Sequence, residues 1–194
     1  RLYQANGLAT LNGPAWARSI EDKLAGRLLP APLRGFWDGT LAQVRRMNAV
    51  TPVAMVSGDL QPQNIHFCDG RWVILDWSND KPAAVAIDFF CELFFAALRE
   101  PGTGEGVAFW EVVSGRRDPA RVSGRAGRML ALWREWLADW LGVRVTTDEV
   151  AIQLRGMCLD WLVTMNHLWN PAGTLWRNPF PALGPERADG GSGA

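Results

Sequence analysis

The chain has 194 residues with a formal net charge of +0, and 48% of its residues are hydrophobic while 21% are charged. This composition suits one globular domain or one large lobe of an enzyme. It argues against a disordered segment and against a polybasic protein that binds nucleic acid.

The cysteines and the apolar stretches bear on the compartment. The 3 cysteines, Cys68, Cys91 and Cys158, lie far apart, so no short-spaced pair is present to bind zinc and we expect buried, reduced thiols. Charged residues interrupt every apolar stretch before it reaches the roughly 20 residues that span a bilayer. We therefore expect a cytoplasmic protein with no membrane partner and no nucleic-acid partner.

Two helices are predicted at the start of the chain. Apolar side chains recur every four positions from Trp16 to Leu28, which predicts a helix over residues 14–29. A second helix is predicted over residues 33–47, with Pro52 beyond its end.

Strands are predicted next, because the apolar period changes. Short β-prone runs occupy residues 53–56, 65–68 and 72–75. The turn pair Asp69-Gly70 separates the last two runs, which predicts a β-hairpin with a loop before it.

Helical spacing returns after Pro82. A helix containing Phe89 and Phe94 is predicted first, then shorter pieces around Phe109, then two long helices over residues 122–141 and 147–169. Thr146-Thr147-Asp148-Glu149 is typical of a helix N-terminus, since a hydroxyl or carboxylate there accepts hydrogen bonds from free amides. The predicted fold class is α+β, mostly α, with one small β-hairpin.

Three polar residues surround the predicted hairpin. Asp59 lies in the loop before it, Asn64 follows five residues later, and Asp76 comes directly after its second strand. Magnesium prefers hard oxygen ligands and keeps several waters, so one carboxylate, one amide oxygen and the phosphates of a nucleotide suffice to hold it. Phosphoryl transfer needs one further carboxylate, which orients the attacking hydroxyl and accepts its proton.

This segment resembles the catalytic loop and metal-binding segment of the aminoglycoside phosphotransferase and choline kinase family, whose members share the protein-kinase-like fold. The resemblance rests on Gly58-Asp59-Leu60, Pro62, Asn64-Ile65 and Ile74-Leu75-Asp76-Trp77. It implies that Asp59 is the catalytic base and that Asn64 and Asp76 bind magnesium and nucleotide. Asp88 resembles a family aspartate that braces the catalytic loop by hydrogen bonds, and residues 8–12 resemble the family's helix after the hinge between lobes.

The resemblance further implies a kinase-like C-terminal lobe over residues 1–172, with the N-terminal lobe absent from this chain. The polar, glycine-rich end of the sequence predicts a flexible tail, which we place over residues 173–194. The implied activity is that of a small-molecule kinase. It moves the terminal phosphate of ATP or GTP, with Mg²⁺, to a hydroxyl of an aminoglycoside, an amino alcohol or a sugar. We expect this chain to be inactive without the missing lobe.

A second hypothesis stays open, a kinase-like pseudoenzyme or binding scaffold without turnover. The family usually has histidine where this chain has Ser57, and the two lysines, Lys23 and Lys81, do not match the family's nucleotide-binding lysine. Asp160, between Leu159 and Trp161, is the best acidic candidate to meet an acceptor, although a capped or exposed helix carboxylate is the alternative.

Overall fold

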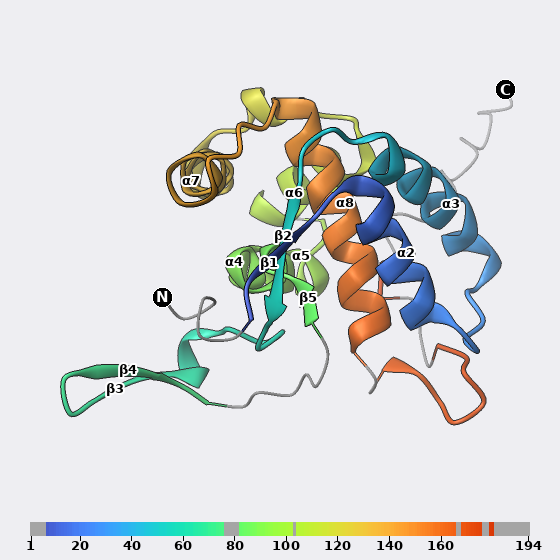
Figure 1. Ribbon diagram of the computed structural model, residues 1–194, viewed down its shortest axis with the longest axis horizontal. Helices are drawn as coiled ribbons and strands as arrows, with labels where there is room; N and C mark the ends of the chain where they lie inside the picture. The colour runs from blue at the N-terminus through green and yellow to red at the C-terminus, as the bar shows by residue number, and fades with distance from the viewer. Residues whose placement is uncertain (1–6, 76–81, 103, 166–167, 176–178, 181–194) are drawn as a thin grey trace, which may run out of the picture.

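The computed structural model describes residues 7–75, 82–102, 104–165, 168–175 and 179–180. Its architecture is α+β and mostly helical, as the sequence predicts, with helices on either side of a small three-stranded sheet and a two-stranded sheet that projects from the body (Figure 1). Within the described residues, no helix is both long enough and apolar enough to cross a membrane.

The elements follow one another along the chain as follows. The strands are β1 (Ala9–Leu11), β2 (Thr51–Met55), β3 (Ile65–Cys68), β4 (Arg71–Ile74) and β5 (Pro82–Ala84). The helices are α2 (Gly13–Leu24), α3 (Ala31–Arg46), α4 (Ala86–Phe89), α5 (Cys91–Arg99), α6 (Gly104–Ser114), α7 (Gly124–Leu141) and α8 (Thr147–Thr164), with short 3₁₀ helices η1 (Pro62–Asn64) and η2 (Pro119–Arg121).

The first sheet is antiparallel, with strand order β1-β2-β5. Only its central strand β2 was predicted. The resemblance implied a helix over residues 8–12, and this prediction is wrong, because Ala9–Leu11 pairs with Thr51–Val53 as strand β1. Helix α2 begins immediately after this strand, where the Asn12 side chain accepts a hydrogen bond from the Ala15 amide.

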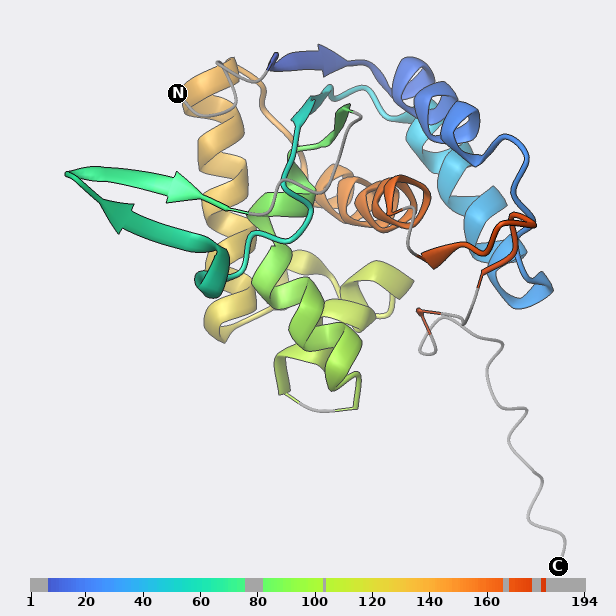
Figure 2. The same ribbon diagram turned by 90° about the horizontal axis from the view of Figure 1, so that it is seen from below.

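The predicted hairpin is confirmed as β3–β4, in a register that pairs Phe67 with Trp72. Asp69 and Gly70 both have positive φ, at 51° and 75°, as the two central residues of a type I′ turn require. The hairpin projects from the body of the protein in both views (Figures 1 and 2).

Helix α2 ends earlier than predicted. It stops at Leu24 rather than near residue 29, and Gly26 follows with a φ of 79°. Leu28 was predicted to lie on the same helical face as Trp16 and Ile20, but it follows the helix and is 65% exposed. The four-residue spacing of apolar residues therefore extends in the sequence past the end of helix α2.

The C-terminal helices are close to the prediction. The residues around Phe109 form one helix, α6, instead of shorter pieces. Helix α8 ends at Thr164 and begins with a complete capping box, in which Thr146 and Glu149 each bond the other's backbone amide. The predicted N-terminus of this helix is confirmed.

Helix α8 runs through the middle of the molecule and contacts α2, α3, α4, α6 and β5 (Figures 1 and 2). Its approach to α2 is close, since a Cβ added at Gly156 would meet the ring of Trp16 at 2.3 Å. Trp16 is completely buried. A side chain at position 156 would therefore separate the two helices.

The predicted tail begins inside this packed structure. Thr174 forms an isolated bridge with Leu28, and Leu175 forms one with Trp169. The ring of Phe180 is completely buried beside Trp110. The packed part of the chain thus extends to Phe180, beyond the predicted boundary at residue 172, while residues 181–194 lie outside the described residues.

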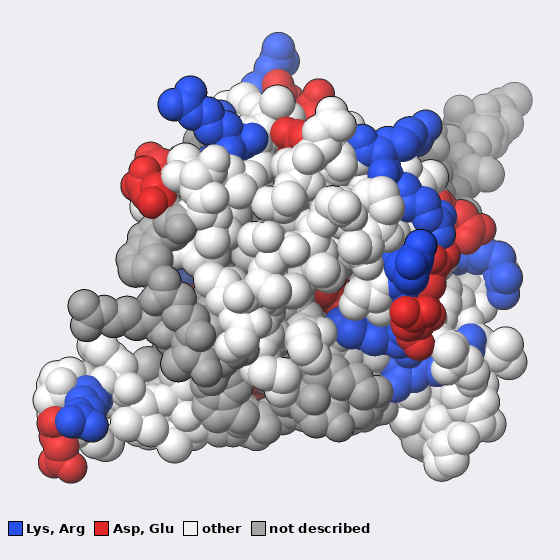
Figure 3. Space-filling view, in the orientation of Figure 1, with Lys and Arg blue, Asp and Glu red and all other residues white. Residues whose placement is uncertain are grey.

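Charged residues of both signs lie around the edge of the face shown in Figure 3, and uncharged residues occupy its middle. The projecting hairpin is mostly uncharged apart from its tip (Figure 3). On this face the described residues form no extended patch of one sign, which agrees with the net charge of +0.

Candidate active site

The loop that carries Asp59 leaves the central strand of the first sheet. Strand β2 ends at Met55, and Gly58 follows with a φ of 76°, a left-handed conformation that glycine adopts without strain. The chain then reaches η1 and enters β3. We call residues 56–64 the catalytic loop, after the segment of the phosphotransferase family that they resemble.

Asp88 holds the start of the catalytic loop. Its two carboxylate oxygens accept hydrogen bonds from the backbone amides of Ser57, at 2.9 Å, and Gly58, at 2.7 Å. Asp88 is 3% exposed and lies in α4, the short helix that follows β5. The prediction that Asp88 braces this loop is confirmed.

Asp59 and Asn64 lie together at the other end of the loop. The Asn64 side-chain amide donates to the backbone oxygen of Asp59 at 2.8 Å and to its carboxylate Oδ2 at 3.1 Å. The Gln61 side-chain amide donates to Oδ1 of the same carboxylate. Because both oxygens accept amide hydrogens, the half-buried carboxylate is held in one orientation.

The sequence analysis missed Gln61 as a residue of this site. A glutamine two residues after an aspartate has no distinctive spacing, so its contact depends on the turn that the loop makes. Its backbone amide also donates to the Asp59 carbonyl oxygen, at 2.8 Å. The turn therefore places both donors of Gln61 on Asp59.

Asp76 lies outside the described residues, so its position relative to Asp59 and Asn64 stays a prediction. The residue before it is described. The amide of Leu75 donates to the carbonyl oxygen of Asn64 at 2.8 Å, which brings the end of the hairpin back to Asn64.

The side-chain oxygen of Asn64 is a suitable ligand for a hard cation. Its amide nitrogen is used by Asp59, so its side-chain oxygen is the atom with which it would bind magnesium. Over the described part of the chain, no three His, Cys, Asp or Glu side chains gather in a metal-binding group. Magnesium needs fewer protein ligands than that when phosphate oxygens and water complete its coordination.

Cys91 is buried beside the catalytic loop at the start of α5. Burial, together with the negative charges of Asp88 and Asp59, raises the pKa of the thiol to about 12. The sequence predicted three buried thiols, which is confirmed for Cys91 and Cys158 but wrong for Cys68, because that residue lies on the projecting hairpin and is exposed. A thiol with such a pKa stays protonated at neutral pH, so Cys91 serves as an apolar packing group rather than as a nucleophile.

Asp160 is a residue of the interior and does not face an open acceptor pocket. It is 0% exposed and forms an ion pair with Lys23, whose Nζ lies 2.6 Å from Oδ1. This corrects both sequence readings of Asp160, as a contact to an acceptor and as a capped or exposed helix carboxylate.

Three tryptophans of the C-terminal helices, Trp133, Trp136 and Trp161, pack in or against the core. Trp133 and Trp161 are 0% and 3% exposed. Trp136 stacks on Trp133 with ring centroids 5.2 Å apart.

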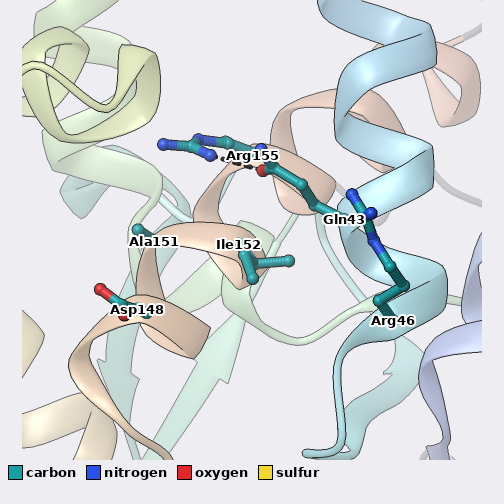
Figure 4. A pocket seen from close by; sticks show the side chains of 6 residues that line it. All are labelled: Gln43, Arg46, Asp148, Ala151, Ile152 and Arg155. Atoms are coloured by element: carbon teal, nitrogen blue, oxygen red, sulfur yellow. Dashed lines mark hydrogen bonds between the residues drawn. The ribbon is translucent and has the colours of Figure 1, made fainter.

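A pocket of about 340 Å³ lies between α3 and α8 (Figure 4). Its lining residues are Gln43, Arg46, Asp148, Ala151, Ile152 and Arg155. The Arg155 side chain is held inside the protein, since it donates to Gln43 and to the carbonyl oxygen of Val113. None of the lining residues belongs to the catalytic loop, so this pocket is separate from the candidate active site.

The catalytic loop with Asp59, Asn64 and Asp88 thus forms one hydrogen-bonded unit. Comparison of the chain with protein-family models, with curated proteins and with solved structures finds no match.

Proposed function

We propose that this chain is the catalytic C-terminal lobe of a protein-kinase-like phosphotransferase that acts on a small molecule. The reaction moves the terminal phosphate of ATP or GTP to a hydroxyl of an aminoglycoside, an amino alcohol or a sugar. The observation that carries the proposal is the orientation of the Asp59 carboxylate by Asn64 and Gln61, in a loop braced by Asp88.

In this proposal Asp59 orients the acceptor hydroxyl and accepts its proton. Each carboxylate oxygen has two lone pairs, and one amide hydrogen bond uses only one of them. The carboxylate therefore keeps acceptor capacity for a substrate hydroxyl. A positioned base of this kind contributes roughly 10²–10⁴-fold to a rate.

Asn64 and Asp76 are the residues proposed to hold magnesium. The cation would neutralise charge that develops on the transferred phosphoryl group. The role of Asn64 is to present its side-chain oxygen while its amide holds Asp59. A single side chain would thereby link the position of the base to the position of the phosphates.

The contact between the loop and Asp88 supports retained activity with serine at position 57. Asp88 is bonded by the backbone amides of Ser57 and Gly58, and a backbone amide is present whatever the side chain. The absence of the family's histidine therefore leaves this bracing contact intact.

A further lobe is proposed to cover the hairpin and complete the nucleotide site. Phe67 and Trp72 are 61% and 73% exposed on one face of the hairpin, and exposed apolar faces of this kind mark contact surfaces. Lys23 is the single lysine among the residues that the structure describes, and its ammonium group forms an ion pair with Asp160. The cationic partner of the phosphates is therefore proposed to come from the lobe that covers the hairpin.

A phosphate-transfer assay tests the proposal. The protein made from its complete gene is incubated with Mg²⁺, ATP or GTP, and a panel of aminoglycosides, amino alcohols and sugars. We expect transfer to at least one class. Asp59→Asn should lower kcat roughly 10²–10⁴-fold with little change in nucleotide affinity.

The control is Asp69→Asn, a matched substitution in the exposed turn of the hairpin, which should leave kcat unchanged. Wild-type turnover in Asp59→Asn would remove Asp59 from the mechanism. Nucleotide binding with no transfer to any acceptor would instead favour the scaffold hypothesis.

A further inference from the structure

The ion pair of Lys23 and Asp160 is among the most buried polar features of the protein. The side chains of Lys23 and Asp160 are 10% and 1% exposed, and Nζ and Oδ1 are 2.6 Å apart. The residues are separated by 137 positions in the chain, on α2 and α8. Burial of two charges is costly and is tolerated only when they pair and are well hydrogen-bonded.

Both members of the pair also bind the backbone of β5. Asp160 Oδ2 accepts a hydrogen bond from the amide of Ala84 at 2.8 Å. The Lys23 ammonium donates to the carbonyl oxygen of Pro82 at 2.6 Å. The carboxylate thus accepts a hydrogen bond from one backbone group of β5, and the ammonium donates one to another.

These two backbone groups lie on the open edge of the sheet. Strand β5 is the last strand in the order β1-β2-β5, so among the residues that the structure describes no strand lies beside its other edge. Residues two apart in a strand point their backbone groups to the same side. Pro82 and Ala84 therefore present a carbonyl and an amide that a fourth strand would otherwise pair.

Two more donors complete the surroundings of Asp160. The indole nitrogen of Trp16 donates to Oδ2 at 3.2 Å, and the Thr164 hydroxyl lies 3.4 Å from Oδ1. Trp16 and Lys23 both come from α2, so this helix supplies two of the groups that hold the carboxylate in place.

Strand β5 leads from this pair to the catalytic loop by two routes. It pairs with β2, whose end continues directly into the loop, in the register Val53↔Ala84 to Met55↔Pro82. It is also followed by α4, which carries Asp88, the residue that bonds the amides of Ser57 and Gly58. A shift of β5 would therefore move both attachments of the loop.

We infer that the Lys23–Asp160 ion pair takes the place of a fourth strand at the edge of β5 and thereby positions the catalytic loop. Lys23 and Asp160 are positioning residues in this account, because neither touches the loop itself. The effect on catalysis rests on the proposed phosphotransferase function, whereas the effect on the loop does not.

The ionic character of the pair explains why removal of one partner should be severe. Lys23→Met keeps most of the aliphatic length but leaves the Asp160 charge buried without its cation and the Pro82 carbonyl without its donor. Lys23→Arg keeps the positive charge and a donor, so it is the conservative variant. Arg45→Met is the matched control, since Arg45 forms an exposed ion pair with Glu21.

The first measurement is hydrogen exchange of backbone amides in the protein made from its complete gene, below the unfolding temperature of each variant. In Lys23→Met we expect amides of residues 83–88 and 56–60 to exchange at least about tenfold faster, while amides of α7 keep their rates. Lys23→Arg should restore slow exchange in part, and Arg45→Met should match the wild type. Equal acceleration in α7, or unchanged exchange in residues 83–88, would overturn the inference.

The second measurement separates positioning from simple loss of stability. Once an acceptor that receives phosphate is identified, Lys23→Met should lower kcat about 10–100-fold with little change in the KM for nucleotide. A small misplacement of a catalytic group acts on the chemical step. Selectively faster exchange with an unchanged kcat would show that the pair does not position the base. A wild-type protein that transfers no phosphate would refute the proposed function, and the exchange rates of residues 56–60 would then decide the inference alone.

Discussion

The catalytic loop and the β3–β4 hairpin are consecutive in the chain but differ in what determines their shape. A residue distant in the sequence holds the start of the loop, because Asp88 lies 30 and 31 positions from the amides that it binds. The hairpin is held by its own turn and ladder, from Ile65↔Ile74 to Cys68↔Arg71. Ser57 is completely buried, whereas Trp72 is 73% exposed.

This difference shows how the two regions contribute to a site. Asp88 on α4 holds the start of the loop, and Asn64 and Gln61 within the loop orient a carboxylate that is still half exposed. The hairpin places Phe67 and Trp72 side by side, with ring centroids 5.0 Å apart, on a face open to solvent. The loop is thus already organised in this chain, while the hairpin presents a surface suited to contact another lobe.

The largest expected effect comes from Asp88→Ala. It leaves two buried amides without their acceptor, at a cost of roughly 1–3 kcal/mol each, so we expect the free energy of unfolding to fall by about 2–6 kcal/mol. Asp88→Asn keeps one acceptor oxygen and should lose less. Urea unfolding measures the loss, and an alanine variant as stable as the wild type would remove the contrast between loop and hairpin.

The cysteines provide a second comparison of the two regions. Cys91 beside the loop has a pKa raised to about 12, first by burial and then by Asp88 and Asp59, whereas Cys68 is exposed on the hairpin. At pH 8 a thiol reagent should modify Cys68 roughly 10³-fold faster or more, because the thiolate is the reactive form. Mass spectrometry of the labelled protein gives both rates, and rapid labelling of Cys91 in the folded protein would contradict its burial.

The same pKa predicts a dependence of stability on pH. Above about pH 9, the ordinary pKa of the thiol, the unfolded chain releases the Cys91 proton while the folded protein keeps it until about pH 12. The stability contributed by the protonated thiol is complete below pH 9 and is lost as the pH rises toward 12. Cys91→Ala should therefore lose less stability between pH 8 and pH 10 than the wild type does.

Gly70→Ala tests whether the hairpin depends on its turn alone. The φ of 75° at Gly70 costs an alanine about 1–2 kcal/mol, although space for the methyl group is open. We expect faster amide exchange in β3 and β4 with no change in the catalytic loop. Gly39→Ala, in α3 with equally open space, is the matched control and should be neutral or stabilising. A change in the loop would mean that the two regions are coupled.

The smallest effect on stability is expected for Trp72→Ser. The side chain is mostly exposed, and its cross-strand contact with Phe67 contributes about 0.2–1 kcal/mol. Removal of the indole should instead weaken self-association of the 194-residue chain through the exposed hairpin face, as measured by sedimentation. A loss of several kcal/mol on urea unfolding would place the hairpin in the core and not on a contact surface.

Local chemistry accounts for the features that the sequence determined by itself. The hairpin follows from Asp69-Gly70, the start of α8 from the Thr146–Glu149 capping box, and the fold class from the apolar periods. The bracing role of Asp88 came from the resemblance, together with the proposed roles of Asp59 and Asn64. The hairpin turn, the helix start and the pair of Asp59 and Asn64 rest on residue types at a fixed short spacing, whereas Asp88 lies 30 positions beyond Gly58.

The tertiary structure decided what depends on distant partners. Strands β1 and β5 have three residues each and show no period of their own, so they exist because β2 lies between them. A helical period does not show where a helix stops, which is why the predicted helix extended past Leu24 to include Leu28. The sequence suggested an accessible carboxylate at Asp160, whereas the fold pairs it with Lys23 of α2, 137 positions away. Burial and charge pairing are properties of the folded chain and cannot be derived from local spacing.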